Sequence, residues 1–394
     1  MTFAPSEEKL WVRVPREKPA HVPDAEINDR YIRGEGRIVI ETNREKLPGF
    51  VALLKQSNYM DLRPFYQRRP RWKADKQSLL IESFIMNIPV PPVFLYERDY
   101  NSYEVMDGQQ RITALRDFYE GKFELEGLER WPEINGRTYQ TLPDKIQQGL
   151  DRRSITSIVL LKESTTDEEE ASTLRETVFD RLNTGGTKLS RQEIRNALYR
   201  GRMNDLVDRL SRLPKFREAW GVPAWVENEI DVTPGLLENS LYEKMEDVEL
   251  VLRFFALRHV ENYTGGMQPF LDLYMRKAAA FTHDDLEVLE REFIDTLNLV
   301  SAVYGEVLFR PFDPAQNVWM PSAQKAFYDA VMVGMSGLLD RAERVETKAA
   351  DIREATAQMF REEEEGTFTG RGNTKNDIRT RISLFREMVE RTIT

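Results

Sequence analysis

The sequence predicts an α+β N-terminal domain with a mixed sheet, followed by an all-helical C-terminal domain. Up to about residue 200, strand-like apolar runs alternate with amphipathic helical patterns. Beyond that point amphipathic helical patterns dominate, and no internal repeat of fixed period is seen. We therefore expect an N-terminal arm at 1–30, an α+β domain at 31–200 and a helical domain at 201–394.

The arm is rich in proline and charge, and the α+β domain follows it. Strands are expected at 37–41, 93–96, 103–106 and 155–161, and helices at 47–55, 75–87 and 112–119. A hairpin-like turn at 99–102 joins the second and third strands. Asp75 is the expected N-cap of the helix at 75–87, and prolines end that helix. Its inner face is expected to carry Leu79, Leu80, Phe84 and Ile85.

Further helices complete the prediction. One begins at Thr165 or Thr166 and ends at Gly185-Gly186, where glycine supplies a left-handed cap. Ser190 and Glu193 have the spacing of a capping box and begin the next helix. In the C-terminal domain we expect helices at 245–259, 284–303, 323–339 and 376–390.

Composition excludes several classes of protein. The 394 residues contain no cysteine, which rules out disulfides, thiolate catalysis and cysteine-ligated zinc. The only histidines are His21, His259 and His283, too far apart to suggest a metal-dependent nuclease, so no metal site is expected from the protein alone. No apolar run is as long as a membrane span and no signal-peptide core is present, which predicts a cytoplasmic protein. The net charge of −10 leaves room only for a local basic groove.

The most informative motif is Asp107-Gly108-Gln109-Gln110-Arg111, between a predicted strand and a predicted helix. Glycine permits a tight turn and leaves room for a ligand. The amides that follow it start a helix, which is a natural seat for an anion. The guanidinium of Arg111 can bind a phosphate through two parallel hydrogen bonds (bidentate binding). Asp107 can hold a metal, position a water or act as a general base. The alternative makes Asp107 a helix cap and Arg111 an ion-pair residue.

Three other polar clusters accompany this motif. The first runs from 179 to 197 and contains Asn183, Thr184, Gly185, Gly186, Arg195 and Asn196. Capping explains Ser190 and Glu193 but not Asn183, Arg195 and Asn196. The second cluster contains Gln67, Arg68, Arg69, Arg71, Trp72 and Lys73. Its cations can bind phosphates and the ring of Trp72 can stack on a base. The alternative is a solvated basic loop whose Trp72 packs into the core. The third is a weaker basic patch with Arg371, Lys375, Arg379 and Arg381.

Taken together, these residues resemble a known family. Gln67-Arg68 with Trp72, the Asp107–Arg111 motif, and the Leu-Asn-Thr-Gly-Gly run with its following Arg-Asn-Ala look like the DGQQR-motif family, which has a ParB/sulfiredoxin-like fold. That family supplies the N-terminal domain of GmrSD-type type IV restriction enzymes and of SspE-like defence proteins. The resemblance covers roughly residues 60–200.

The resemblance implies a bacterial anti-phage role for the chain. Carried over, Asp107, Gln109, Gln110 and Arg111 form the catalytic core. Around them we expect a nucleotide or base pocket (Gln67, Arg68, Trp72, Gly108, Asn183, Thr184, Gly185, Gly186, Arg195 and Asn196). The basic clusters themselves, and not the resemblance, suggest DNA-backbone contacts at Arg69, Arg71, Lys73, Arg371, Lys375 and Arg379. Many relatives attach an HNH nuclease, whose clustered histidines the C-terminal half here lacks, so cutting of DNA in that manner is not expected.

Three functions stay open at this level. In the first, the protein recognises foreign or modified double-stranded phage DNA, glucosylated DNA for example, and hydrolyses a nucleotide. The candidate cofactor is then a nucleoside triphosphate with Mg²⁺, and a separate effector protein receives the signal. In the second, a DNA glycosylase excises modified bases and leaves abasic sites. In the third, a ParB-like module binds DNA without chemistry and regulates. No membrane partner is expected.

Overall fold

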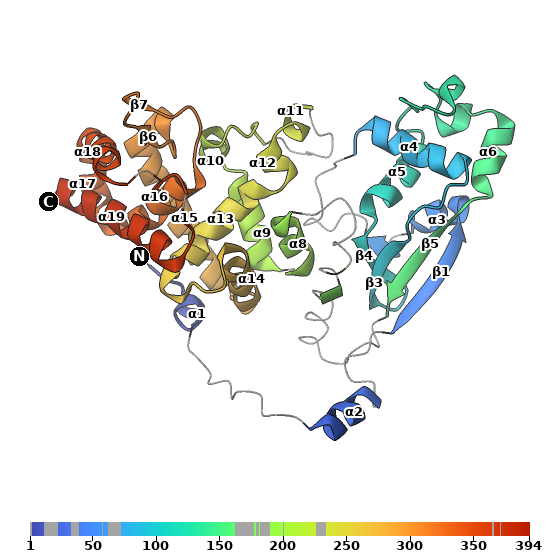
Figure 1. The fold of residues 1–394 in the computed structure, drawn as a ribbon, viewed down its shortest axis with the longest axis horizontal. Coiled ribbons are helices and arrows are strands. Elements are labelled where there is room, and N and C mark those ends of the chain that lie inside the picture. Colours follow the sequence, from blue (N-terminus) through green and yellow to red (C-terminus); the bar gives the residue numbers. More distant parts are fainter. Residues whose placement is uncertain are drawn as a thin grey trace. The chain divides into compact units, whose positions relative to one another are not determined.

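The computed structural model describes residues 2–11, 23–32, 39–56, 58–61, 72–161, 177–178, 181, 190–199, 201–225, 234–364, 366–370 and 372–394. The chain forms two compact units, a sheet unit at Pro15–Lys188 and a helical unit made of Met1–Val14 with Leu189–Thr394 (Figure 1). This division differs from the expected domains at both ends. Residues 1–14 belong to the helical unit instead of a separate arm, and the helical unit begins before residue 200.

The sheet unit contains a five-stranded mixed sheet. Its strands are β1 (Ile40–Lys46), β2 (Met60–Asp61), β3 (Val93–Asp99), β4 (Ser102–Asp107) and β5 (Ser154–Leu160), in the order β1-β5-β3-β4-β2. β3 pairs antiparallel with β4 and parallel with β5, while β1 is antiparallel to β5 and β2 is parallel to β4. The predicted mixed sheet and the predicted hairpin between β3 and β4 are both confirmed.

Helices pack on this sheet around one apolar core. They are α3 (Leu47–Leu53), α4 (Ala74–Ile85), α5 (Gln109–Tyr119) and α6 (Asp144–Asp151), with short 3-10 turns at Pro132–Ile134 and Tyr139–Thr141. α2 (Asp24–Ile32) precedes the first strand. The core contains Ile81 and Phe84 of α4, Val93 of β3, and Ile112 and Phe118 of α5. The helices predicted at 75–87 and 112–119, before and after the Asp107–Arg111 motif, therefore correspond to α4 and α5.

Two details of the predicted N-terminal domain are wrong. The N-cap position of α4 is Lys73 and not Asp75. Leu79 is 43% exposed, whereas Ile81 is fully buried, because the inner face of α4 also carries polar side chains that the apolar pattern did not reveal. One of these, Glu82, accepts hydrogen bonds from the backbone amides of Arg130 and Trp131 and so fastens the following loop to α4.

The first strand is also displaced from its predicted place. β1 begins at Ile40 instead of Arg37, and residues 33–38 lie outside the described residues. The prediction placed this strand at the apolar residues within 37–41. The observed edge strand instead runs through the polar residues that follow, up to Lys46. Its residues are mostly exposed, and its register pairs Ile40 with Leu160. Backbone pairing with β5, more than side-chain burial, holds this strand in the sheet.

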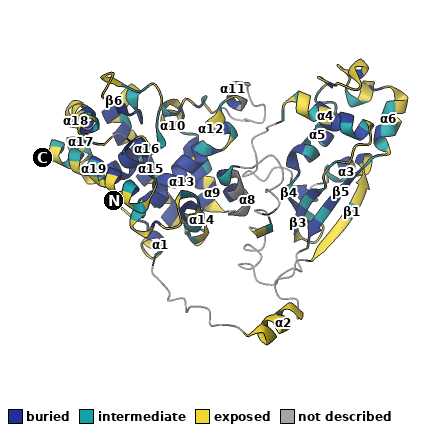
Figure 2. Ribbon diagram, viewed as in Figure 1, coloured by how far each residue is buried: buried dark blue, intermediate teal, exposed yellow. Residues whose placement is uncertain are grey.

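The helical unit is built around two nearly enclosed helices. Every residue of α13 (Glu246–Leu257) after the first is buried, and the same is true of α16 (Lys325–Ser336) (Figure 2). Around them lie α8 (Arg191–Leu198), α9 (Arg202–Ser211), α10 (Pro214–Ala219), α11 (Pro234–Leu237), α12 (Ser240–Glu243), α14 (Met267–Ala278), α15 (His283–Tyr304), α17 (Ala342–Thr347), α18 (Ala349–Glu362) and α19 (Lys375–Ile393). The four predicted helices of this region are confirmed to within a few residues.

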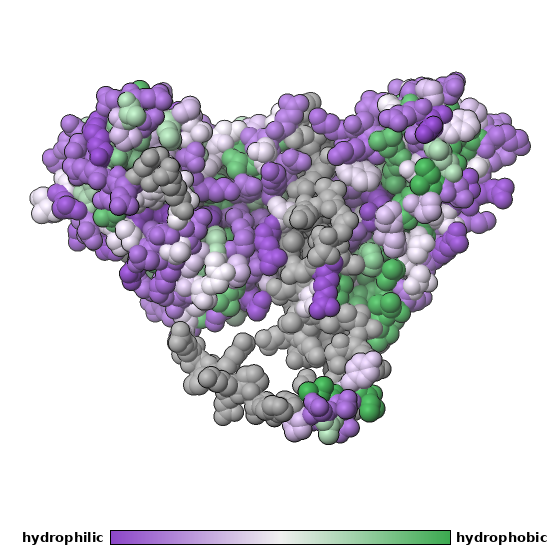
Figure 3. Space-filling model, viewed as in Figure 1, coloured by the Kyte–Doolittle hydropathy of each residue, from purple (hydrophilic) through white to green (hydrophobic). Residues whose placement is uncertain are grey.

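This unit is not purely helical. Two short strands, β6 (Phe312–Asp313) and β7 (Val318–Trp319), form an antiparallel pair. Two residues per strand are too short for an alternating pattern to be recognised in the sequence. Over the helical unit the visible surface is mostly hydrophilic (Figure 3). None of the helices in the described ranges is both long and apolar enough to cross a membrane.

The N-terminal residues are anchored by a buried acid. Glu7, in α1 (Pro5–Glu8), is fully buried in the helical unit, and its Oε1 lies 2.9 Å from His259 Nε2. Arg258 Nη1 is 3.5 Å from the same oxygen, and Tyr274 donates a hydrogen bond to it. The separate arm was predicted from the proline and charge content of residues 1–30. Composition of this kind cannot show that one acid, Glu7, has buried partners in the helical unit.

Candidate functional site

The Asp107–Arg111 turn joins the sheet to its most central helix. Asp107 is the last residue of β4, Gly108 occupies the N-cap with φ of +96°, and α5 begins at Gln109. A Cβ atom on Gly108 would stand 2.6 Å from Val93 Cγ1 and 3.0 Å from Arg111 Nη2. The tight turn is confirmed, but the room expected for a ligand beside Gly108 is filled by Val93 and Arg111.

We predict that Gly108→Ala destabilises the sheet unit by about 2–4 kcal/mol. The left-handed backbone alone costs alanine about 1–2 kcal/mol, and the contact with Val93 adds overpacking strain of similar size. Urea unfolding of the full chain measures the loss. Gly149→Ala in α6 is the matched control, because Gly149 has open space around its Cβ position and no left-handed φ. A loss no larger than that of the control would contradict the account.

One guanidinium nitrogen of Arg111 makes two hydrogen bonds that hold the side chain against the turn. Its Nη2 donates to Asp107 Oδ2 at 2.8 Å and to the carbonyl of Pro92 at 3.1 Å. Its Nε is buried, and neither Nε nor Nη1 has a hydrogen-bond partner among the described residues. The side chain of Arg111 is 17% exposed and that of Asp107 is 30% exposed. The ion pair of the alternative interpretation is therefore present, yet it leaves part of the guanidinium available.

Two carboxamides complete the turn. Gln109 and Gln110 are only 8% and 9% exposed, although they lie in the first turn of α5. The first hydrogen bond of the helix runs from the amide of Ile112 to the carbonyl of Gly108. The amides before Ile112 therefore precede the helical ladder and carry the positive end of the helix dipole. Asp107, Gly108, Gln109, Gln110 and Arg111 thus form one compact polar turn, and their role in catalysis stays a prediction.

Most of the other predicted pocket residues cannot be placed. Gln67, Arg68, Arg69, Arg71, Asn183, Thr184, Gly185, Gly186 and Arg371 lie outside the described residues. Trp72 is half-buried and packs against the core of the sheet unit, which is the structural alternative considered for it. Lys73 is exposed at the N-cap position of α4.

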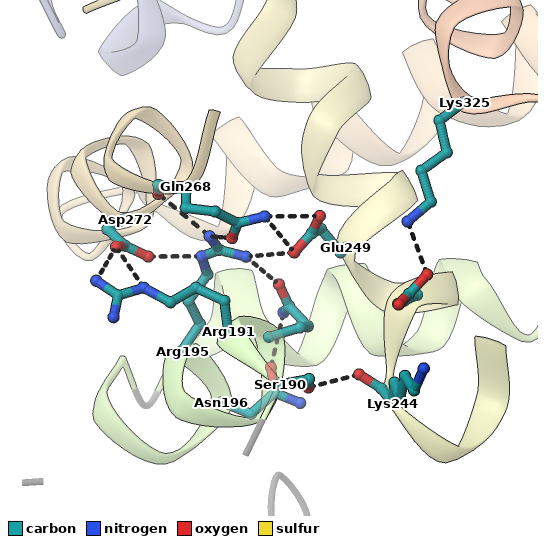
Figure 4. A network of polar contacts seen from close by, with 11 residues as sticks. Ser190, Arg191, Arg195, Asn196, Lys244, Glu249, Gln268, Asp272 and Lys325 are labelled. Carbon is teal, nitrogen blue, oxygen red and sulfur yellow. Dashed lines mark hydrogen bonds and ion pairs between the residues drawn. The ribbon is translucent and has the colours of Figure 1, made fainter. Parts of the chain in front are cut away.

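Arg195 and Asn196 lie in α8, inside the helical unit, and both are fully buried (Figure 4). The Nε of Arg195 donates to Asp272 at 2.6 Å, and its Nη1 donates to Glu249 at 2.9 Å and to Gln192 at 3.0 Å. Its Nη2 donates to the backbone and side-chain oxygens of Gln268. All three guanidinium nitrogens are therefore engaged within the helical unit.

This network corrects the pocket role predicted for Arg195. A fully buried guanidinium with every nitrogen bonded joins α8 to α13 and α14 and has no donor left for a ligand. Asn196 accepts a hydrogen bond from Gln192 at 2.9 Å and is enclosed with it. The sequence could show that these side chains exceed the needs of helix capping. It could not show their partners, because Glu249 and Asp272 lie 54 and 77 positions further along the chain.

The network also affects the ionisation of Glu249. Burial opposes its charge, but the positive charge of Arg195 and the hydrogen bond from it outweigh burial and lower the pKa of Glu249. A carboxyl whose pKa is lower in the folded state stabilises the fold above its unfolded pKa, near 4.3. That stabilisation is lost as the pH falls through the folded value.

We therefore predict that the helical unit loses stability below about pH 4, where protonation of Glu249 breaks its pair with Arg195. Thermal unfolding followed by circular dichroism between pH 6 and pH 3 measures the effect. The variant Glu249→Gln should begin with a lower unfolding temperature and lose less of it on acidification. An equal acid-induced decrease in both proteins would show that Glu249 does not contribute.

The C-terminal basic patch divides into exposed and buried members. Lys375 and Arg379 lie on the surface near Glu261, at 3.3 Å and 3.9 Å from its carboxylate. Exposed pairs of this kind contribute little and can exchange partners, so both residues stay candidates for DNA contacts. Arg381 is 1% exposed, which excludes it as a surface contact. Among the described residues, no three histidine, cysteine or acidic side chains converge as a metal site.

With this geometry known, comparison with protein families is informative. Residues 51–200 match the family model of the N-terminal domain of the GmrSD restriction endonuclease. This stretch is similar to the N-terminal domain of GmrSD-type restriction enzymes. The matched stretch contains the Asp107–Arg111 turn, four of the five strands of the sheet, and α8. No curated protein and no solved structure matches the chain.

Proposed function

We propose that this chain acts in restriction-type defence, recognising foreign or modified DNA and hydrolysing a nucleotide at the Asp107–Arg111 turn. The family match supports the defence role and the action on DNA. The single observation that carries the chemistry is Arg111, whose Nε and Nη1 have no partner in the described chain, at the N-terminus of α5.

The turn has the groups that phosphoryl chemistry needs. Transfer of a phosphoryl group depends mainly on positioning and on stabilising the charge of the phosphate oxygens. The start of α5 attracts phosphate, and Arg111 offers Nη1 to one phosphate oxygen and Nη2 to a second once Nη2 leaves Asp107. The carbonyl of Pro92 and the carboxylate of Asp107 fix the position of Arg111, so little order has to be created when the nucleotide binds.

Asp107 would act on the water or on the metal. Mg²⁺ in nucleotide enzymes is held by one or two carboxylates together with the phosphates, and it neutralises charge on those oxygens. Asp107 is the acid of this turn, and its carboxylate is 30% exposed beside Arg111. In the resting protein Arg111 keeps Asp107 paired, and a phosphate competing for Arg111 would free Asp107 to orient water.

Hydrolysis of a nucleotide has better support than base excision. Excision requires an aromatic ring that stacks on a flipped base, and Trp72 was the ring considered for that task. Trp72 is half-buried against the core of the sheet unit. The partly exposed carboxylate of Asp107 keeps base excision as the alternative. The expected partners are double-stranded phage DNA and a separate effector protein.

Product analysis separates the two reactions. The full chain is mixed with glucosylated phage DNA, with and without ATP or GTP and Mg²⁺, and both the nucleotides and the DNA are analysed by mass spectrometry. The proposal predicts nucleoside diphosphate and phosphate, with intact glycosidic bonds in the DNA. Released bases and alkali-labile abasic sites without nucleotide turnover would overturn it in favour of excision.

A further inference from the structure

The helical unit contains a partly polar cavity, formed by residues far along the sequence from the Asp107–Arg111 turn. It has a volume of about 550 Å³, in the range of small-molecule sites. Residues from the end of α10, from α12 and from the centre of α13 line it, together with Arg310 and the segments before α16 and before α19. We call it the α16 cavity. The family match ends at residue 200, before all of these residues.

The start of α16 faces this cavity without a side-chain cap. Gln324, Lys325 and Ala326 line the cavity, and the side chain of the N-cap residue Gln324 makes no capping hydrogen bond. The helical ladder begins with the amide of Tyr328. The amides of Lys325, Ala326 and Phe327 have no acceptor in the described part of the chain. They offer several donors and the positive end of a helix dipole to an anion.

Basic side chains gather at the same cavity. Arg310 lines it, is half-buried and has no side-chain hydrogen bond or ion pair within the described ranges. Arg253 also lines it and is 7% exposed. Arg253 uses Nε and Nη2 to hold Asp329, which leaves its Nη1 without an acceptor among the described residues. Lys325 is paired with Glu246 at 2.7 Å.

A second buried arginine, Arg381, lies near Arg253. Arg381 is 1% exposed and its Nη1 is buried without a partner in the described chain. Burial lowers the pKa of Arg381, as does the charge of Arg253, while Asp329 opposes both. Asp329 is the acid that pairs with Arg253, and Glu249, the other buried acid near Arg253, is paired with Arg195. Asp377, the other acid near Arg381, is occupied in capping the start of α19. Buried charges in proteins are normally paired, so a bound anion would complete this group.

One wall of the cavity is aromatic. Trp220 lines it, is 8% exposed, and its Nε1 is a buried donor with no acceptor among the described residues. Its ring is stacked on Phe309 with centroids 6.0 Å apart, which fixes its orientation. An aromatic wall beside an uncapped helix start and basic side chains suits a planar group attached to phosphate.

We propose that the α16 cavity binds a small phosphate-bearing molecule of nucleotide size. The phosphate lies at the start of α16 between Arg310 and Arg253, and the rest of the molecule lies along Trp220. This site is separate from the proposed hydrolytic turn, so each can fail without the other.

Calorimetric titration of the full chain tests this inference, with inorganic pyrophosphate, ATP and GTP as probes. The titrations use the Arg111→Ala variant, in which the turn of α5 has lost its fork. We expect one molecule bound per chain, and about ten- to hundred-fold weaker binding after the additional change Arg310→Ala, because one charge-assisted contact is lost. Arg310→Lys should have an intermediate affinity, since it keeps the charge without the fork.

Arg344→Ala is the matched control, because it removes an exposed arginine elsewhere in the helical unit. Circular dichroism establishes that each variant is folded, and the rise in unfolding temperature on adding pyrophosphate gives a second readout of binding. Equal affinities of the Arg310 and Arg344 variants, or no binding of any probe, would overturn the proposal. A duplex DNA with 5′-phosphate ends tests the other source of phosphate, and binding of that duplex alone would assign the cavity to DNA ends.

Discussion

Replacing Arg111 by alanine is expected to reduce nucleotide hydrolysis by about 10²–10³-fold, the usual effect of removing one positioned donor for the developing charge. The reason is geometric. Arg111 is fixed by Asp107 and by the carbonyl of Pro92, while its other guanidinium nitrogens have no partner in the described chain. Phosphate release measured with ATP or GTP and Mg²⁺ reports the loss.

Two further variants show whether the fork itself is needed. Arg111→Lys keeps the charge but cannot reproduce the planar pair of donors, so it should recover only a small part of the activity. Arg130→Ala removes an exposed arginine of the same unit and should hydrolyse nucleotide like the unaltered protein. Full activity in Arg111→Ala, with a folded protein, would place the chemistry somewhere other than this turn.

Replacing Arg195 by methionine is expected to destabilise the helical unit by about 3–5 kcal/mol, as breaking a buried ion pair on one side usually does. Methionine keeps much of the volume but leaves Glu249 and Asp272 without their central partner. Both acids are at most 7% exposed, so solvent cannot replace the lost contacts. Urea unfolding followed by tryptophan fluorescence measures the change.

Arg191→Ala is the matched control for this experiment. Arg191 lies on the same helix and contacts the same Asp272 at 2.9 Å, but its side chain is 37% exposed. Exposed pairs contribute about 0–1 kcal/mol, so this variant should unfold close to the unaltered protein. Equal losses in both variants would show that burial of the Arg195 network does not govern its contribution.

Local patterns in the sequence were sufficient for most of the fold. The β3–β4 hairpin, the turn at Gly108 and the four predicted helices of the helical unit each have a local signal, whereas α14 and α18 were not predicted. The structure departs from the prediction where long-range packing decides. Glu7 lies in a polar stretch and Glu82 within an apolar helix, and only the tertiary fold gives these acids buried partners.

The same distinction holds for the candidate site. The Asp107–Arg111 turn is contiguous, so its residues could be grouped from the sequence alone. Arg195 looked like a ligand-binding residue because its partners are distant in the chain, and the structure assigns it to a buried network. Arg253, Arg310 and Trp220 form a cavity from three separate segments, and no local pattern connects them.

The most direct test of the account measures phosphate release from ATP and GTP by the full chain with glucosylated phage DNA, with unmodified DNA of the same sequence and without DNA. We expect the rate of hydrolysis to be higher with glucosylated DNA than with unmodified DNA or without DNA, and we expect hydrolysis to be lost in Arg111→Ala. Hydrolysis that is absent under all three conditions, or that is unchanged in Arg111→Ala, would contradict it.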